Sequence, residues 1–241
     1  IEGGRARALA LTSCTNLTVE RCAIRNLGTD GIYISGGSNV TVQDGSILNT
    51  GDHGIEINAG DRATLTSCAH LIYNMEISYF SRFDLTNRPA VRVRGVGTTI
   101  RNCEIHHTSH QAIKLYGNNH LVEKCLIHHC MSTSTDGGVI YGGRDWGARG
   151  QVFQDNIIHS CDSDMGVNPW DVVAFYFDDC DSGKVIQRNV IYGVDGIGIS
   201  IGGGRDNLIY NNIIQGVDWG VFADMRGTAT ILWDTGNATE T

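Results

Sequence analysis

Proline, charged residues and aromatic side chains are all scarce in this chain of 241 residues, and each shortage narrows the kinds of protein it can be. Only 2 residues are proline, and 18% are charged against about 25% in typical globular domains. The 18 basic residues are outnumbered by 26 acidic ones, and the resulting net charge of −8 argues against nucleic acid as a partner. No apolar run approaches the ~18 residues that a membrane span requires, so we also expect no membrane span.

The first residues lack a signal-peptide pattern, and we expect residues 1–241 to form a single domain that is a portion of a longer chain. The eight cysteines include no Cys-x-x-Cys pair, which argues against a zinc ribbon or a thioredoxin-type site. Asn-x-Ser/Thr acceptors at Asn16, Asn39 and Asn237 are compatible with secretion. We therefore expect a secreted, extracellular protein.

Glycine, in contrast, is abundant, with 31 residues, and many of these glycines open one short strand pattern that occurs eight times. Successive copies start 22 to 26 or 36 residues apart, and such self-similarity is typical of a solenoid. The copies are Gly31–Ile34, Gly54–Ile57, Ala90–Val93, Ala112–Leu115, Gly138–Tyr141, Ala174–Phe177, Gly198–Ile201 and Gly220–Ala223.

A second pattern runs between these copies. Its apolar residues are two apart, and an Asn or Cys stands two residues before an apolar one. It includes Val19–Ile24, Ile100–Ile105 and Val185–Val190, and its period of two indicates strands rather than helices. Several short strands per turn of about 22 residues, with no crossover helix, predict an all-β parallel β-helix of about eight or more coils.

Three loop segments carry a more specific resemblance: Tyr141–Trp146, Asp178–Gly183 and Gly202–Asn207. Together with the repeats, they resemble the right-handed, pectate-lyase-like parallel β-helix superfamily, near family 141 of the glycoside hydrolases. The resemblance implies a right-handed solenoid and activity on carbohydrates, with a polysaccharide or oligosaccharide as the partner. It does not assign a catalytic pair.

Side chains alternate between the inside and the outside of a coil, so the repeat predicts which residues share a column. Two inward columns run from Ile32 through Val139 to Val221, and from Ile34 through Tyr141 to Ala223. The next position at the edge of the rod is predicted to hold Ser35, Asn58, Arg94, Tyr116, Gly142, Asp178, Gly202 and Asp224.

Two acids in that edge column, Asp178 and Asp224, have only Gly202 between them. A separation of two coils places their Cα atoms about 9 to 10 Å apart, and the glycine between them is expected to leave open space. Carboxyl groups about 6.5 to 9.5 Å apart suit an acid and a base that hydrolyse a glycosidic bond with inversion. We expect these two residues to be catalytic, with Asp179 and Asp145 as alternates.

The same corner carries further charged and aromatic residues that we expect to bind substrate: Arg144, Trp146, Tyr176, Arg205, Asp206, Phe222 and Arg226. Aromatic rings can pack against the faces of pyranose sugars, and Trp170 and Trp219 are further candidates. Asp181 also falls in this corner. The competing interpretation is that the Asp-Gly segments are ordinary polar turns.

His106, His128 and His159 occur three residues after successive Cys or Asn anchors and are predicted to stack, with His107 and His129 beside them. A metal site would need convergent nitrogens and a carboxylate, so we expect a structural ladder and no metal. Two cysteine pairs, Cys103 with Cys125 and Cys130 with Cys161, are predicted to lie on neighbouring coils, either bonded or as buried thiols.

Three functions are compatible with these patterns. The first is an extracellular glycoside hydrolase without a cofactor. The second is a polysaccharide lyase or epimerase acting on uronates, in which carboxylates hold Ca²⁺ and Arg205 or a neighbour removes a proton. The third is a non-catalytic β-helix of a surface fibre or adhesin, in which flanking coils or a partner chain cover the solenoid ends.

Overall fold

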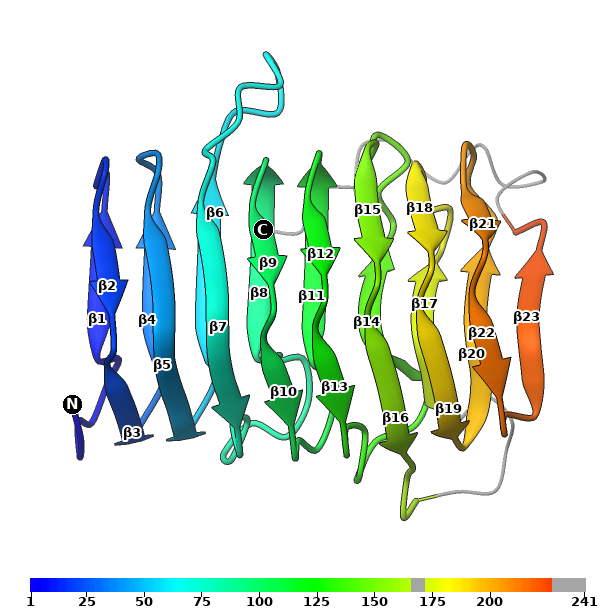
Figure 1. The fold of residues 1–241 in the computed structure, drawn as a ribbon, viewed down its shortest axis with the longest axis horizontal. Helices are drawn as coiled ribbons and strands as arrows, with labels where there is room; N and C mark the ends of the chain where they lie inside the picture. Colours follow the sequence, from blue (N-terminus) through cyan, green and yellow to red (C-terminus); the bar gives the residue numbers. More distant parts are fainter. Residues whose placement is uncertain (166–171, 227–241) are drawn as a thin grey trace.

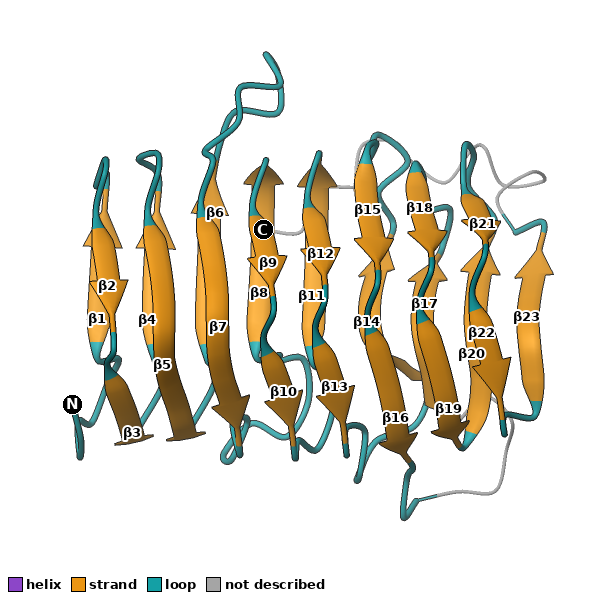
Figure 2. Ribbon diagram, in the orientation of Figure 1, coloured by secondary structure: helices purple, strands orange, loops and turns teal. Residues whose placement is uncertain are grey.

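The computed structural model describes residues 1–165 and 172–226, which form parallel strands stacked into a rod of coils (Figure 1). Trp170 and Asn237 lie outside the described residues. Within the described residues there is no helix (Figure 2), and therefore none that could cross a membrane. Every strand pair between named strands is parallel, as the repeats predicted.

The first sheet has nine strands, one from each coil, in the order in which they occur along the chain. The eight repeated patterns supply eight of them, and an additional strand precedes these. The strands are β1 (Leu9–Thr12), β4 (Ile32–Ser35), β6 (Ile55–Ala59), β8 (Val91–Val96), β11 (Ile113–Asn118), β14 (Gly137–Gly143), β17 (Val172–Asp178), β20 (Gly196–Gly202) and β23 (Trp219–Asp224).

The second sheet has fourteen strands in two strips, and the long strands β5 (Thr41–Thr50) and β7 (Leu71–Ser78) belong to both. One strip adds β2 (Thr18–Glu20), β9 (Thr99–Arg101), β12 (Leu121–Glu123), β15 (Gln151–Gln154), β18 (Lys184–Gln187) and β21 (Leu208–Tyr210). The other adds β3 (Ala23–Leu27), β10 (Glu104–His106), β13 (Leu126–His128), β16 (Ile157–Cys161), β19 (Val190–Val194) and β22 (Ile213–Gln215).

Stacked apolar columns fill the space between the two sheets, and the predicted register holds with one exception. Ile199 pairs with Val221, as expected. The exception is β14, where Ile140 rather than Val139 pairs with Ile113 of β11. Tyr141 therefore takes the outward position beside Tyr176. Gly142 pairs with Phe177, and a Cβ there would lie 2.2 Å from Asp181 Oδ2 and 3.3 Å from Phe177 Cδ1, so the lack of a side chain leaves room for the carboxylate and the ring. The edge column consequently contains Gly143, not Gly142.

The Asn or Cys anchors form ladders at the bend between the two strips of the second sheet. Cys103 and Cys125 are buried there, and all eight cysteines are free thiols. In later coils the side-chain amide of Asn156 donates to Asn189 Oδ1, and that of Asn189 donates to Asn212 Oδ1, at 2.9 and 3.0 Å. Each amide also satisfies buried backbone groups, which explains why polar residues occur inside this part of the core.

Candidate functional site

The two acids of the edge column lie at the ends of the strands β17 and β23, with the end of β20 between them. Gly202 pairs with Asp224, and Phe177 pairs with Ile201, so Asp178 follows in register beside Gly202. Parallel pairing thus brings together carboxylates that are 46 residues apart in the chain.

A single guanidinium, that of Arg226, joins the two acids. Its Nη1 atom is ion-paired with Asp178 Oδ1, and its Nη2 atom lies 2.6 Å from Asp224 Oδ2. The backbone N–H and Nε of Arg226 also donate to Asp224 Oδ1, each at 3.0 Å. The prediction of open space over Gly202 is therefore wrong, because the Arg226 side chain occupies that space.

The two carboxyl groups have environments that displace their pKa values in opposite directions. Burial raises the pKa of Asp178, the neighbouring charge of Asp179 raises it further, and the charge of Arg226 only partly opposes this. Burial also acts on Asp224, but its hydrogen bonds with Arg226 outweigh burial and hold the pKa of Asp224 below its usual value. A pair of this kind has one member suited to donate a proton and one suited to accept it.

Tyrosines cover the buried side of Asp178. The Tyr141 hydroxyl donates to Asp178 Oδ2 at 3.4 Å, and the ring of Tyr141 meets that of Tyr176 edge to face. Burial raises the pKa of Tyr176 to about 12, so its hydroxyl stays protonated at neutral pH. The two rings pack with Val173 and Phe222 in an apolar cluster beside the acids, so Tyr176 and Phe222 support the site from its apolar side.

Asp179 and Arg144, both predicted members of the site, form a second ion pair next to Asp178, with Arg144 Nε 2.9 Å from Asp179 Oδ2. Asp179 also lies 3.7 Å from Arg226 Nη1. Its carboxylate therefore faces the same guanidinium as the two proposed catalytic acids. Because Asp179 raises the pKa of Asp178, its contribution here is electrostatic.

A cavity of about 320 Å³ opens beside Asp224, and five of the predicted site residues line it: Trp146, Arg205, Asp206, Asp224 and Arg226. The Arg205 guanidinium lies 5.4 Å from the centre of the Trp146 ring and 2.7 Å from Asp206. The Trp146 side chain, 49% exposed, offers a flat apolar face. A larger groove of about 650 Å³ runs over the second sheet along Asp44, Asn74 and Asn102, and none of the predicted site residues lines it.

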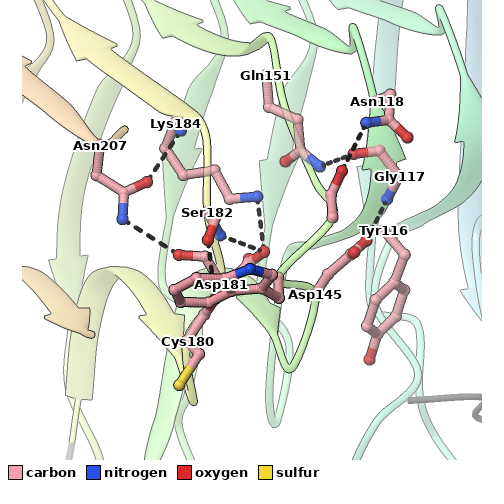
Figure 3. Close-up of polar contacts among 12 residues, drawn as sticks. Tyr116, Gly117, Asn118, Asp145, Gln151, Cys180, Asp181, Ser182, Lys184 and Asn207 are labelled. Atoms are coloured by element: carbon pink, nitrogen blue, oxygen red, sulfur yellow. Dashed lines mark hydrogen bonds and ion pairs between the residues drawn. The ribbon is translucent and has the colours of Figure 1, made fainter. Parts of the chain in front are cut away.

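Asp145 is the predicted catalytic alternate that the structure does not bring to the others. Its carboxylate accepts a hydrogen bond from the backbone N–H of Gly117 at 3.1 Å (Figure 3). It accepts another from Arg62 Nη2 at 2.8 Å. It faces β11 rather than Arg226, so it does not share the cleft of Asp178 and Asp224.

Behind this loop lies a buried ion pair that the repeat pattern does not predict. Lys184 Nζ donates to Asp181 Oδ1 at 2.9 Å, and both side chains are at most 1% exposed (Figure 3). The second carboxylate oxygen, Oδ2, has no hydrogen-bond partner among the described residues, and burial raises the pKa of Asp181 to about 6. The spacing of three residues in Asp181-Ser182-Gly183-Lys184 was the only signal for this pair.

Comparisons with known proteins agree with this architecture. The family model described as "Right handed beta helix region" matches residues 1–75 and 69–237. A solved structure entitled "Glycoside hydrolase" is similar in fold, with a TM-score of 0.66 and 17% sequence identity over 90% of this chain. The similarity covers 38% of that protein, so this chain spans well under half of its length. No curated protein matches the chain.

Proposed function

The chain belongs to the right-handed β-helix family, and we propose that it is a secreted glycoside hydrolase acting on a polysaccharide or oligosaccharide. The observation that carries the proposal is the pair Asp178 and Asp224, held by one guanidinium with pKa values displaced in opposite directions. The resemblance of the loop segments to carbohydrate-active β-helix proteins supports the same substrate class. Family 141 of the glycoside hydrolases is our finer assignment.

In the proposed reaction Asp178 is the general acid and Asp224 the general base. Asp178 gives its proton to the glycosidic oxygen as the bond from that oxygen to the anomeric carbon breaks. Asp224 takes a proton from water, whose oxygen bonds to the anomeric carbon from the opposite face. The backbones of the two acids lie two coils, about 9.6 Å, apart, so we expect the carboxyl groups to reach an inverting separation once the contact of Asp178 with Arg226 opens.

Arg226 has two roles in this scheme. Its Nε and Nη2 atoms hold Asp224 ionised through contacts between residues only two apart, which can persist while substrate binds. The Nη1 contact with Asp178 has to open for the sugar to enter. Opening it removes a charge that lowers the pKa of Asp178, and the acid therefore becomes more fully protonated when substrate is present.

The cavity beside Asp224 supplies the proposed sugar-binding surface. Trp146 offers an aromatic face for a pyranose ring, and Arg205 and Asp206 offer donors and acceptors for hydroxyl groups. A surface that combines an aromatic ring with side chains of positive and negative charge suits a neutral sugar better than an anionic polymer.

The test is hydrolysis of a polysaccharide panel, followed by reducing-end release and by NMR of the first anomer formed. We expect Asp178→Asn and Asp224→Asn to lower turnover about 10²- to 10⁴-fold, the usual contribution of general acid–base catalysis. The control is Asp155→Asn, since Asp155 forms a similar ion pair with Arg188 but lies in the bend between β15 and β16 of the second sheet. Activity in both site variants at the parental rate would refute the assignment.

Two further outcomes separate the alternatives. Unsaturated products that absorb in the ultraviolet, formed only with Ca²⁺ present, would identify a lyase. No turnover and no binding of any glycan by the intact protein would instead favour a structural β-helix.

A further inference from the structure

Two adjacent stacks of aromatic rings run along the outer face of β10, β13 and β16, which lie side by side in the lower half of Figure 1. Neighbouring rings in both stacks are 4.8 to 5.0 Å apart, which is the rise of one coil. One stack contains His106, His128, His159 and Tyr192, and the other contains Tyr79, His107 and His129.

Between the stacks the imidazole nitrogens converge. His106 Nδ1 lies 2.6 Å from His107 Nδ1, and His128 Nδ1 lies 2.7 Å from His129 Nδ1. One nitrogen from each of His106, His107 and His128 lies within 4.8 Å of the others. The positive φ angles of His107 and His129, 55° and 52°, turn each ring back toward the histidine that precedes it. These are the convergent nitrogens that a metal site requires.

Carboxylates lie on the far side of the first stack. His106 Nε2 is 3.5 Å from Glu76 Oε1, and His128 Nε2 is 3.3 Å from Glu104 Oε1. A carboxylate at Nε2 favours the tautomer that carries its proton there, which leaves the lone pair of Nδ1 free for a metal ion.

We propose that His106, His107 and His128 bind one divalent transition-metal ion through their Nδ1 atoms. Imidazole nitrogens select ions such as Zn²⁺, Co²⁺, Ni²⁺ and Cu²⁺ over Ca²⁺ and Mg²⁺, which prefer oxygen. Tetrahedral Zn²⁺ with bonds of about 2.0 to 2.1 Å needs its nitrogens about 3.3 Å apart, so the rings have to rotate to bring together nitrogens that now lie within 4.8 Å of one another. The ion would link β10 to β13, on neighbouring coils.

The paired histidines do not continue into the next coil, and this coil provides a control residue for the proposed metal site. His159 continues the first stack, but Ser160 occupies the position that His107 and His129 hold in the preceding coils. His159 Nδ1 lies 3.0 Å from the Ser160 hydroxyl, whereas the Nδ1 atoms of His106 and His128 lie beside the imidazole nitrogen of the next residue. A variant at His159 therefore removes a stacked imidazole without removing a proposed ligand.

The test is calorimetric titration of protein purified without a polyhistidine tag, using ZnCl₂ or CoCl₂, with CaCl₂ for comparison. Losing a hydrogen-bond partner of a metal-binding histidine usually costs 10- to 100-fold in affinity, so we expect about that loss for Glu104→Gln and at least ~100-fold for His128→Gln. His107→Asn should behave like His128→Gln, and asparagine tolerates the left-handed backbone at this position. His159→Gln should bind like the parent, and circular dichroism checks that every variant folds.

The visible spectrum of bound Co²⁺ distinguishes the ligands. We expect bands of tetrahedral cobalt without the near-ultraviolet thiolate charge transfer that Cys130 or Cys161 would produce. The proposal is overturned by the absence of saturable Zn²⁺ or Co²⁺ binding, by equal losses in His159→Gln and His128→Gln, or by a thiolate spectrum. None of these readouts depends on hydrolysis, so the result is independent of the proposed function.

Discussion

Arg226 and Gly202 lie against each other at the ends of adjacent strands, and a Cβ at position 202 would come within 3.0 Å of Arg226 Nε. A side chain at position 202 would therefore push against the guanidinium that lies between Asp178 and Asp224. This contact links the backbone of the first sheet to the electrostatics of the proposed catalytic pair.

We expect Gly202→Leu to displace Arg226 and to lower kcat/KM more than tenfold, because both carboxyl groups lose their common partner. Steady-state kinetics on the substrate identified in the panel measures the effect. The matched control is Gly220→Leu on β23, where an added Cβ meets nothing within 4 Å. Equal losses in the two variants would show that the contact with Arg226 is unimportant.

Arg226→Gln should move the whole pH–activity profile toward higher pH. Burial raises the pKa of Asp224 and Arg226 lowers it more strongly, so removing the guanidinium lets this pKa rise. The pKa of Asp178, already raised by burial, also increases when the opposing charge is lost. Since the base must be ionised and the acid protonated, both limbs shift in the same direction. Arg188→Gln serves as the control, and an unchanged profile for Arg226→Gln would contradict the acid–base assignment.

Trp146→Ala should raise KM by about tenfold or more with a smaller effect on kcat. The indole lies in the cavity wall beside the reacting groups, so its loss removes binding shared by substrate and transition state. Phe83→Ala, which truncates a side chain that is 70% exposed elsewhere on the surface, should change neither constant. A fall in kcat alone would place Trp146 in catalysis rather than in binding.

The buried pair of Asp181 and Lys184 predicts a characteristic pattern of stabilities. Removing one partner leaves an uncompensated buried charge, so Asp181→Asn should lower the free energy of unfolding by about 3 to 5 kcal/mol at pH 7. The double variant Asp181→Asn with Lys184→Met should recover much of that loss, as measured by urea denaturation. A double variant as unstable as the sum of the single ones would show that the charges are not coupled.

The same carboxyl group makes stability depend on pH. The pKa of Asp181 is raised to about 6 in the folded protein, against about 3.9 for an unfolded chain. Between these values the folded state binds more protons, so the contribution of Asp181 to the free energy of unfolding decreases as pH rises from about 4 to 6. Urea denaturation at intervals of pH should show this slope in the parent and not in Asp181→Asn.

The sequence predicted the β-helix and its first sheet because the period of two and the period of about 22 residues point to the same inward columns. The predicted register was wrong by one residue in β14, where the adjacent glycines Gly137 and Gly138 allow two alignments of the repeat. A slip of one residue exchanges the two faces of a strand, which moved Tyr141 from the core to the site.

The contacts within the candidate site were harder to predict than its position in the fold. The edge column correctly placed Asp178 and Asp224, but nothing in the spacing indicates that Arg226 occupies the space between them. Asp145 was misplaced because its partner, Arg62, lies 83 residues earlier in the chain. Such pairings depend on loop conformation, which the repeat does not determine.

The amide ladder of Asn156, Asn189 and Asn212 has a direction. Each side chain gives its N–H to the oxygen of the amide in the following coil, so the bond dipoles add along the rod and each bond polarises the next. The central member both donates and accepts within the ladder, whereas Asn156 only donates to the next amide and Asn212 only accepts from the preceding one. A substitution at Asn189 therefore removes a hydrogen bond to the coil on either side, and three uncharged groups couple three successive coils.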